Sequence, residues 1–241
     1  MSDSRLIDDL RAASPFRGLR SDWIERLAIH CTRRQLSAGD YVWRRGEAAQ
    51  SFIVVKEGLI AVQRDMVDGE NVLVALFGPG DTLCVVPALQ HVPFPADAVT
   101  VSERAEVLVV TAAPVLRALD HDVELAAALN RALLDHTSSL RNKIDIVSAG
   151  TVPRRVAALL LYLAERFGHE SDDGTVEIYP AVTREQIGQL VNARTETVIR
   201  IMSRWSKAGW VQGAAPRLTL LRTDMLRRMA RDAAGTRVLA R

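Results

Sequence analysis

The sequence of 241 residues lacks the features that mark secreted, membrane and metal-cluster proteins. It contains only two cysteines, Cys31 and Cys84, which are too few for a disulfide framework and do not form a spaced metal-binding cluster. No apolar run is long enough to span a bilayer. The N-terminal MSDSRLIDDLRAAS carries acidic residues and lacks the apolar core of a secretory signal. We therefore expect a soluble cytoplasmic protein with no metal site and no membrane partner.

The sequence also lacks the motifs that carry common enzyme chemistry. It has no nucleophile elbow, no phosphate-binding loop and no His-Glu metal motif. The glycines of FGPGD indicate a turn, because no helix that could cradle a phosphate follows them. We therefore predict a protein that is not an enzyme.

Charge is nearly balanced over the whole chain, with a net value of +2, but it is unevenly distributed. Residues 150–241 carry 15 Lys/Arg against 9 Asp/Glu, whereas residues 1–149 carry 16 against 20. A basic C-terminal part favours a polyanionic partner, with a merely solvated basic surface as the alternative.

Short β-like segments between about residues 34 and 111 predict a β-rich module that follows short helices within residues 3–30. Short strands at regular spacing with Gly or Asp-Gly turns are typical of a sandwich or barrel. The strand-like segments are YVWRR, SFIVVKEGLIAVQRD, NVLVALF and EVLVV, and the turns are Gly39-Asp40, Gly46, Gly58, Asp68-Gly69 and Gly80-Asp81.

A long helix is predicted from about Ala113 to Ala149, with apolar or small residues three and four positions apart on one stripe. The stripe either packs on the β module or pairs two chains as a coiled coil, and its narrowness over about three heptads favours pairing. His136 is either a sensor or, as we favour, an ordinary seam residue. Gly150 ends the helix and Pro153 suits the first turn of the next, which predicts an interdomain hinge. The stripe consists of Leu125, Leu129, Leu133, His136, Leu140, Ile144 and Val147.

The segment TREQIGQLVNARTETVIRIMSRWSKAGW predicts two short helices joined by a tight turn. Thr183 suits the N-cap of the first helix, with Gln186 completing a capping box. Thr195 is expected to cap the second helix, and Gly209 to stop it. Such a pair is typical of a helix-turn-helix whose second helix enters the major groove, and RLTLL suits the strand of a following wing. The alternative is an ordinary helical hairpin inside a core.

The stretch TREQIGQLVNARTETVIRIMSRW resembles the DNA-binding signature of the Crp/Fnr transcription regulators. The stretch LSAGDYVWRRGEAAQSFIVVKEGLIAVQRDMVDGENVLVALFGPGD is similar to the N-terminal β-roll of that family, and the resemblance covers about residues 15–230. It implies an α+β chain in three parts. These parts are N-terminal helices with a cyclic-nucleotide-binding-like β-roll, or jelly roll (1–112), a dimerisation helix (113–149) and a winged helix-turn-helix domain (150–241).

The resemblance implies a homodimer on an inverted-repeat operator, with RNA polymerase as a further partner. Glu196 and Arg200 match the family's base-reading positions, where Arg suits guanine and Glu suits cytosine. The cyclic-AMP-responsive branch carries an Arg at the position of Thr195, so the half-site is expected to be the TTGAT type of the Fnr-like branch. Ile199 replaces a common serine and suits a thymine methyl group. The expected DNA contacts are Arg184, Thr195, Glu196, Thr197, Ile199, Arg200, Ser203 and Arg204, of which Arg184, Thr195 and Ser203 suit phosphates.

The signal is expected to differ from those of the two best-known branches. Where the cyclic-nucleotide branch has Gly-Glu, this chain has Cys84-Val85, and its Arg-Ser or Arg-Thr pair falls near Ala96-Asp97. An anionic phosphate would meet Asp97 and no guanidinium, which is costly in a buried site. We therefore predict no cyclic AMP binding of the usual kind. An iron–sulfur sensor of the Fnr type is excluded, because no cysteine precedes Cys31.

Heme is kept as an alternative for sensing carbon monoxide or nitric oxide. Cys84 falls where the carbon-monoxide-sensing branch has a cysteine ligand and His91 is nearby, but the histidine two positions beyond that cysteine is Val86 here. A buried cysteine is more often a small core residue. The segment HVPFPADAV suits either a pocket or a packed loop. The candidate effector pocket comprises Cys84, Val85, His91, Phe94, Ala96 and Asp97.

Two further readings stay open. Cys31, near Arg33 and Arg34, is the better candidate for a redox-active thiol. From another functional class, the chain could be a dimeric ligand-binding or interaction module that does not bind DNA. No cofactor is assigned, and the small-molecule effector stays unassigned.

Overall fold

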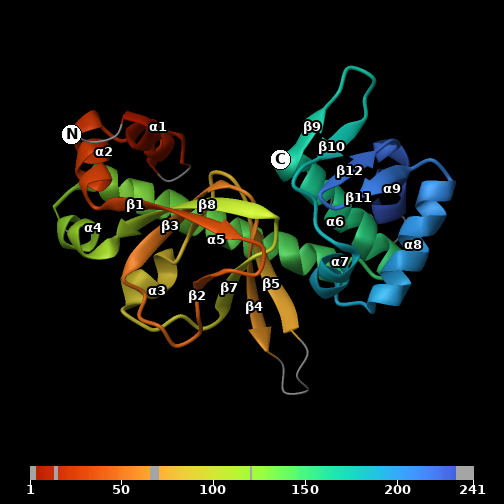
Figure 1. The fold of residues 1–241 in the computed structure, drawn as a ribbon, viewed down its shortest axis with the longest axis horizontal. Coiled ribbons are helices and arrows are strands. Elements are labelled where there is room, and N and C mark those ends of the chain that lie inside the picture. The colour runs from red at the N-terminus through yellow and green to blue at the C-terminus, as the bar shows by residue number, and fades with distance from the viewer. Residues whose placement is uncertain (1–3, 14–15, 66–70, 120, 232–241) are drawn as a thin grey trace. The chain divides into compact units, whose positions relative to one another are not determined.

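The computed structural model describes residues 4–13, 16–65, 71–119 and 121–231. The chain divides into two compact units, one formed by residues 1–63 and 76–138 and the other by residues 64–75 and 139–241 (Figure 1). Within the described residues no helix is both long and apolar enough to cross a membrane.

The β-rich module predicted from the alternating segments is present and is antiparallel throughout its described pairings. One sheet has the order β1-β8-β3-β6 and the other β2-β7-β4-β5. The module begins at Cys31, three residues before the predicted start, and the predicted Asp68-Gly69 turn lies outside the described residues. Its elements are β1 (Cys31–Ser37), β2 (Tyr41–Trp43), β3 (Ser51–Glu57), β4 (Ile60–Asp65), β5 (Asn71–Phe77), β6 (Thr82–Leu83), α3 (Val85–Gln90), β7 (Asp97–Thr100) and β8 (Arg104–Thr111).

Gly58, between β3 and β4, is required by both its conformation and its surroundings. Its φ of +82° is in the left-handed region, and a Cβ there would lie 2.3 Å from the carbonyl oxygen of Arg104. Only glycine meets both conditions, so the sharp connection between the two strands depends on it.

Two N-terminal helices, α1 (Ser4–Ala12) and α2 (Ser21–Ile29), pack into the core of the first unit. An ion-pair network also joins α1 to the sheet. Asp9 lies 2.7 Å from the guanidinium of Arg33 and 3.1 Å from the ammonium of Lys56. Glu106 on β8 pairs with the same two cations at 2.7 and 3.1 Å.

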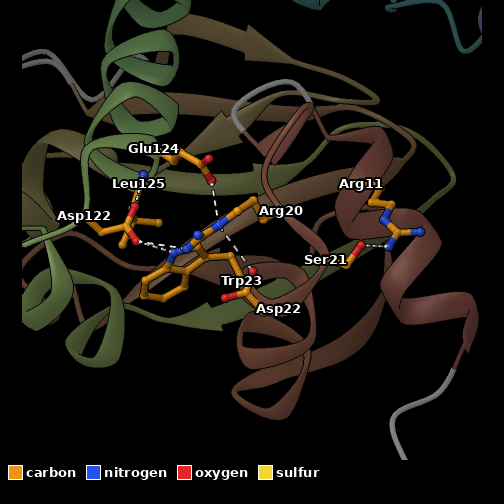
Figure 2. A network of polar contacts seen from close by, with 8 residues as sticks. All are labelled: Arg11, Arg20, Ser21, Asp22, Trp23, Asp122, Glu124 and Leu125. Atoms are coloured by element: carbon orange, nitrogen blue, oxygen red, sulfur yellow. Dashed lines mark hydrogen bonds and ion pairs between the residues drawn. The ribbon is translucent and has the colours of Figure 1, made fainter.

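The long helix predicted over residues 113–149 is present as α5 (Val123–Ser148), but its predicted start is wrong, because a separate short helix, α4 (Ala112–Ala118), precedes it. Asp122 explains where α5 begins. Its Oδ1 accepts a hydrogen bond from the backbone N–H of Leu125 at 2.9 Å, as an N-cap carboxylate does (Figure 2). Its Oδ2 accepts one from the indole N–H of Trp23 on α2 at 2.6 Å. The hydrogen bond from Leu125, followed by that from Trp23, lowers the pKa of Asp122.

The predicted apolar stripe of α5 is divided between two environments. Leu125 and Leu129 are buried in the core of their own chain, and His136 is half-buried. Leu140 and Ile144 are instead 40% and 61% exposed. The packing explanation is therefore confirmed for the first half of the stripe, and pairing of two chains along the second half stays a prediction. We call this second half, with Thr137 on it, the open seam, which consists of Leu133, Thr137, Leu140, Ile144 and Val147 at alternating spacings of four and three. Thr137, Leu140 and Ile144 are exposed, Val147 is half-buried, and Leu133 packs partly against the core of its own chain.

The second unit contains the predicted helix-turn-helix and a small antiparallel sheet of order β11-β12-β10-β9. The predicted helix boundary is confirmed, because Gly150 has a φ of +92° and Pro153 lies in the first turn of the next helix. Motion at this hinge stays a prediction. The elements are α6 (Val152–Phe167), β9 (Gly168–Glu170), β10 (Val176–Ile178), α7 (Arg184–Val191), α8 (Thr195–Lys207), β11 (Val211–Ala214), β12 (Arg217–Leu220) and α9 (Thr223–Arg231).

Candidate nucleic-acid interface

The first helix of the motif, α7, begins with the predicted capping box. The hydroxyl of Thr183 accepts a hydrogen bond from the backbone N–H of Gln186 at 3.1 Å. The side-chain oxygen of Gln186 accepts one from the backbone N–H of Thr183 at 2.8 Å. This reciprocal pair satisfies two N–H groups that a helix start leaves unpaired, so the entry of α7 is fixed locally.

The turn between α7 and α8 is tight because the turn itself lies close against α7 at Gly188. A Cβ on Gly188 would lie 2.8 Å from the carbonyl oxygen of Ala193. Asn192 is in the left-handed region with a φ of 53°, which reverses the chain after α7. The expectation that Thr195 caps α8 is wrong, because Arg194 occupies the N-cap and Thr195 is the first helical residue.

The second helix, α8, has one buried face and one free face. Val198, Ile201, Met202 and Trp205 are buried, and Trp205 stacks on Trp210 with ring centroids 5.8 Å apart. The opposite face is exposed at Glu196, Ile199, Arg200, Ser203 and Arg204, while Thr195 and Thr197 are half-buried.

The free face of α8 combines charged groups with one apolar side chain. The guanidinium of Arg200 donates a hydrogen bond to the Thr197 hydroxyl within its own helix, at 3.4 Å. Ile199 is 48% exposed between Glu196 and Arg200. The structure thus presents a carboxylate, a guanidinium and an aliphatic group together at the front of one helix. These groups can respectively accept from cytosine, donate to guanine and contact a thymine methyl.

Arg184 lies apart from that face. It is half-buried, and its Nη2 donates a hydrogen bond to the carbonyl oxygen of Gly213 on β11 at 2.9 Å. Burial lowers the pKa of Arg184. This side chain therefore ties the start of α7 to the wing, and its predicted contact with a phosphate stays a prediction.

Two cations that the sequence analysis missed hold the end of α7. Lys143 on α5 donates to the carbonyl oxygens of Leu190 and, at 3.1 Å, of Leu73. Burial lowers the pKa of Lys143 to about 8, so the amine is still mostly protonated at neutral pH. Arg155 on α6 donates to the carbonyl oxygens of Val191 and Asn192 at 2.7 and 3.1 Å. Their partners are backbone atoms, for which the sequence carries no signal.

Part of the candidate effector pocket is engaged in internal contacts. Phe94 stacks on Trp43 with centroids 4.6 Å apart, and the Trp43 indole N–H donates to the carbonyl oxygen of Ala96 at 2.9 Å. The carboxylate of Asp97 accepts a hydrogen bond from the backbone N–H of Arg45 at 2.6 Å. These contacts favour the packed-loop alternative for HVPFPADAV.

Cys84 and His91 do not form a prepared heme site. They flank the six-residue helix α3, which places them about 10 Å apart along its axis. Cys84 and its neighbour Val85 are buried, whereas His91 is exposed. Burial raises the pKa of Cys84 well above the ordinary thiol value, so the sulfur is protonated in the metal-free protein. Among the described residues no group of three or more His, Cys, Asp or Glu side chains could hold a metal ion.

Cys31 is not the reactive thiol that its sequence neighbours indicated. Burial raises its pKa to about 11, and the opposing effect of Arg33 is smaller. Arg33 is itself engaged by Asp9 and Glu106. A buried, protonated thiol reacts slowly, so redox sensing through Cys31 has no support in the geometry.

Comparison with known proteins finds two matching families, arranged in the order of the two units. Residues 33–122 match the cyclic nucleotide-binding domain, and residues 154–229 match the Crp-like helix-turn-helix domain. The chain is 27% identical over 223 residues to the CRP-like cAMP-activated global transcriptional regulator of Mycobacterium tuberculosis, covering 92% of this chain and 98% of that protein.

Relatives come from more than one branch. The chain is 28% identical over 184 residues to the nitrogen fixation regulation protein FixK of Azorhizobium caulinodans, covering 76% of this chain and 73% of that protein. Among solved structures, FixK2 from Bradyrhizobium japonicum is similar in fold, with a TM-score of 0.72, 21% identity and coverage of 85% and 99%. The predicted assignment to the Fnr-like branch is therefore not resolved by the relatives.

Proposed function

Because the chain belongs to the Crp/Fnr family of DNA-binding transcription regulators, we propose that it binds an inverted-repeat operator as a homodimer and reads it with α8. The observation that carries this proposal is the free face of α8. Glu196 and Arg200 are one helical turn apart and exposed, and within the described part of the chain neither side chain is bound by a residue outside α8. A helical hairpin belonging to a core would instead bury this face.

Base reading is assigned to three side chains on that face. Arg200 suits the guanine and Glu196 the cytosine of a TTGAT-type half-site, and Ile199 lies where it can touch a thymine methyl. Ser203 and Arg204, farther along α8, suit the phosphates that fix register. Thr195 and Thr197 complete the contact set at the start of the helix.

Pairing of two copies is assigned to the open seam. Membership of this family implies homodimerisation, and the seam offers two exposed apolar side chains, Leu140 and Ile144, one turn apart. A two-fold dimer places its recognition helices in successive major grooves, at about 34 Å along the duplex. We also assign RNA polymerase as a partner of the DNA-bound dimer and the cytoplasm as its location.

The test of DNA binding compares a duplex carrying an inverted TTGAT repeat with a scrambled duplex of equal length, using fluorescence anisotropy. We expect a preference of about a thousandfold or more, together with affinity that falls steeply as salt increases. Equal affinity for the two duplexes would show that the protein binds DNA without reading this sequence. No binding even at low salt would support the alternative of a dimeric interaction module that does not bind DNA.

The signal is assigned to a ligand other than cyclic AMP or an iron–sulfur cluster. In place of the arginine that the resemblance implies for an anionic phosphate, the chain has Ala96 and Asp97, and the Asp97 carboxylate accepts a hydrogen bond from the backbone N–H of Arg45. The similarity to a cAMP-activated regulator makes cyclic AMP the competing candidate. Calorimetric titration with cyclic AMP and cyclic GMP decides between them, and we expect no heat of tight binding.

Heme-dependent gas sensing is the alternative function of the β-roll, and absorption spectroscopy tests it. Reconstitution with hemin is expected to give no Soret band that depends on Cys84 or His91. A band that disappears in Cys84→Ser would restore heme-dependent gas sensing as the function of the β-roll.

A further inference from the structure

The carboxyl end of α7 is held by groups that come from outside the helix-turn-helix. The last carbonyl groups of any helix lack partners within it and carry the negative end of its dipole. Here Leu190 is bound by Lys143, and Val191 and Asn192 are bound by Arg155. The orientation of α7 is therefore fixed by α5 and α6 as well as by its contact with α8.

Lys143 and Arg155 connect α7 to two different helices. Arg155 belongs to α6, an element of the winged-helix domain itself. Lys143 belongs to α5 and immediately precedes Ile144 of the open seam. Its ammonium also reaches the carbonyl oxygen of Leu73 on β5, so one side chain joins α5, α7 and β5 within the second unit.

Withdrawing a lysine ammonium from water is costly unless hydrogen bonds compensate for the loss. Lys143 is withdrawn in this way, although α5 has an exposed face on which a lysine would be fully hydrated. Two carbonyl acceptors on two different elements compensate for that cost. Lys143 can therefore be buried in this way only when α5 and α7 are placed as they are here.

We propose that Lys143 is a positioning residue for operator recognition: it fixes α7, and through the close approach at Gly188 also α8, to the helix that pairs the two copies. This inference rests on the proposed function of DNA binding by a dimer. Two recognition helices bind an inverted repeat together only if their separation matches about one turn of the duplex. Without the link at Lys143, each α8 keeps its contacts with a half-site but loses a fixed place relative to the seam.

The test compares the affinity for a complete inverted repeat with the affinity for a single half-site, at one salt concentration. Lys143→Met keeps the length of the side chain and removes the donors. We expect it to weaken binding to the complete repeat by about tenfold or more, because simultaneous engagement of both half-sites depends on geometry. Binding to the half-site should change by less than about twofold.

Two matched variants control for charge and for donor chemistry. Lys143→Arg retains a cation with several donors and should restore most of the preference for the complete repeat. Arg117→Met removes an exposed cation from α4 and should leave the ratio of the two affinities unchanged. Sedimentation establishes that each variant is still dimeric.

Equal losses at the half-site and the complete repeat, or no loss at either, would overturn the positioning role. Lys143→Gln is the second variant if Lys143→Met does not fold, and failure of both to fold would assign Lys143 a purely structural role. The proposed function fails separately, if the unmodified protein does not prefer the inverted repeat over scrambled DNA.

A distance measurement tests the same inference without DNA. Spin labels at Ser206→Cys, on the exposed end of α8, report the separation of the two recognition helices in the dimer. We expect Lys143→Met to broaden the distribution of distances and Lys143→Arg to preserve it. An unchanged distribution in Lys143→Met would contradict the proposal.

Discussion

At the scale of single residues, Arg200 carries the sharpest prediction. Replacing it with alanine removes a guanidinium that is exposed on the free face of α8. We expect Arg200→Ala to cost about 1–3 kcal/mol of binding free energy and to relax specificity at one base pair. The measurement is a set of operators that each differ at one position of the half-site.

Arg228→Ala serves as the control for Arg200, because it removes an exposed cation from α9 in the same unit. It should leave the ranking of the operators unchanged. If Arg200→Ala instead weakened binding equally to all DNA sequences, Arg200 would contact the DNA backbone. That result would contradict base reading.

Glu106 makes a prediction about acid stability. Burial by itself would raise the pKa of Glu106, but hydrogen bonds from Lys56 and Arg33 outweigh burial and hold the pKa below its ordinary value of 4.5. The stabilisation is therefore fully present above about pH 4.5 and is lost as the pH falls through the lowered value in the folded state. We expect Glu106→Gln to cost about 1 kcal/mol at pH 7 and progressively less in acid.

Urea unfolding of the wild type and Glu106→Gln at several pH values checks this dependence. The difference in free energy of unfolding should shrink as the pH falls below about 4. A difference that is constant from pH 7 to pH 3 would show that the ion pairs at Glu106 do not contribute to stability.

The sequence could predict side chains whose role follows from helix periodicity, and it could not predict those that depend on distant backbone atoms. Exposure of Glu196 and Arg200 follows from the apolar positions on the opposite side of α8. Lys143 and Arg155 instead bind carbonyl groups 47 and 36 residues away. Every residue has a carbonyl group, so no residue type in the sequence marks such a partner.

At the scale of elements, the helix-turn-helix depends on the absence of a side chain at Gly188. A methyl group there would lie 2.8 Å from the carbonyl oxygen of Ala193, so α7 and the turn would have to separate. We expect Gly188→Ala to lower the free energy of unfolding of this domain by about 1–3 kcal/mol and to weaken operator binding.

Thermal and urea unfolding measure that cost, with Gln189→Ala as the neighbouring control in α7. The control should change stability by less than about 0.5 kcal/mol. If Gly188→Ala were as stable as the wild type, the close approach of α7 to the turn would not be a requirement of the motif.

The boundaries of elements show the same division between local and distant causes. The capping box at Thr183 and the stop at Gly150 were predictable, because both signals lie within a few residues of the helix end. The start of α5 was not, because Asp122 is held there by Trp23, 99 residues earlier in the chain. Strand β7 was also missed, because its four residues are too short to show a clear alternation.

At the scale of the whole molecule, the open seam predicts where two copies meet. Ile144 is 61% exposed in the single chain, and a carboxylate there would have to be buried in the paired state. We expect Ile144→Glu to raise the dissociation constant of the dimer by about tenfold or more and to weaken binding to the inverted repeat.

Sedimentation equilibrium over a range of concentrations measures this change. Ile29→Glu is the control, because Ile29 is 71% exposed on α2 and lies off the seam. A dimer that tolerates Ile144→Glu as well as it tolerates Ile29→Glu would place the interface elsewhere.

The order of β-rich module, long helix and helix-turn-helix was predictable from strand spacing, glycine turns and apolar periodicity, and the resemblance to the Crp/Fnr family added the β-roll and the wing. The division of the α5 stripe was not, because periodicity shows that Leu125 and Ile144 share a face but not what covers each of them. Only the tertiary fold assigns the first to the core of its own chain.

That assignment has a consequence for regulation. Because Leu125 and Leu129 are already covered by their own chain, we expect a protomer to fold alone and association to be a separate equilibrium governed by mass action. Below the dissociation constant, the number of dimers grows with the square of the number of chains. Doubling expression in that range would raise operator occupancy about fourfold, so a cell could control such a regulator through its rate of synthesis alone.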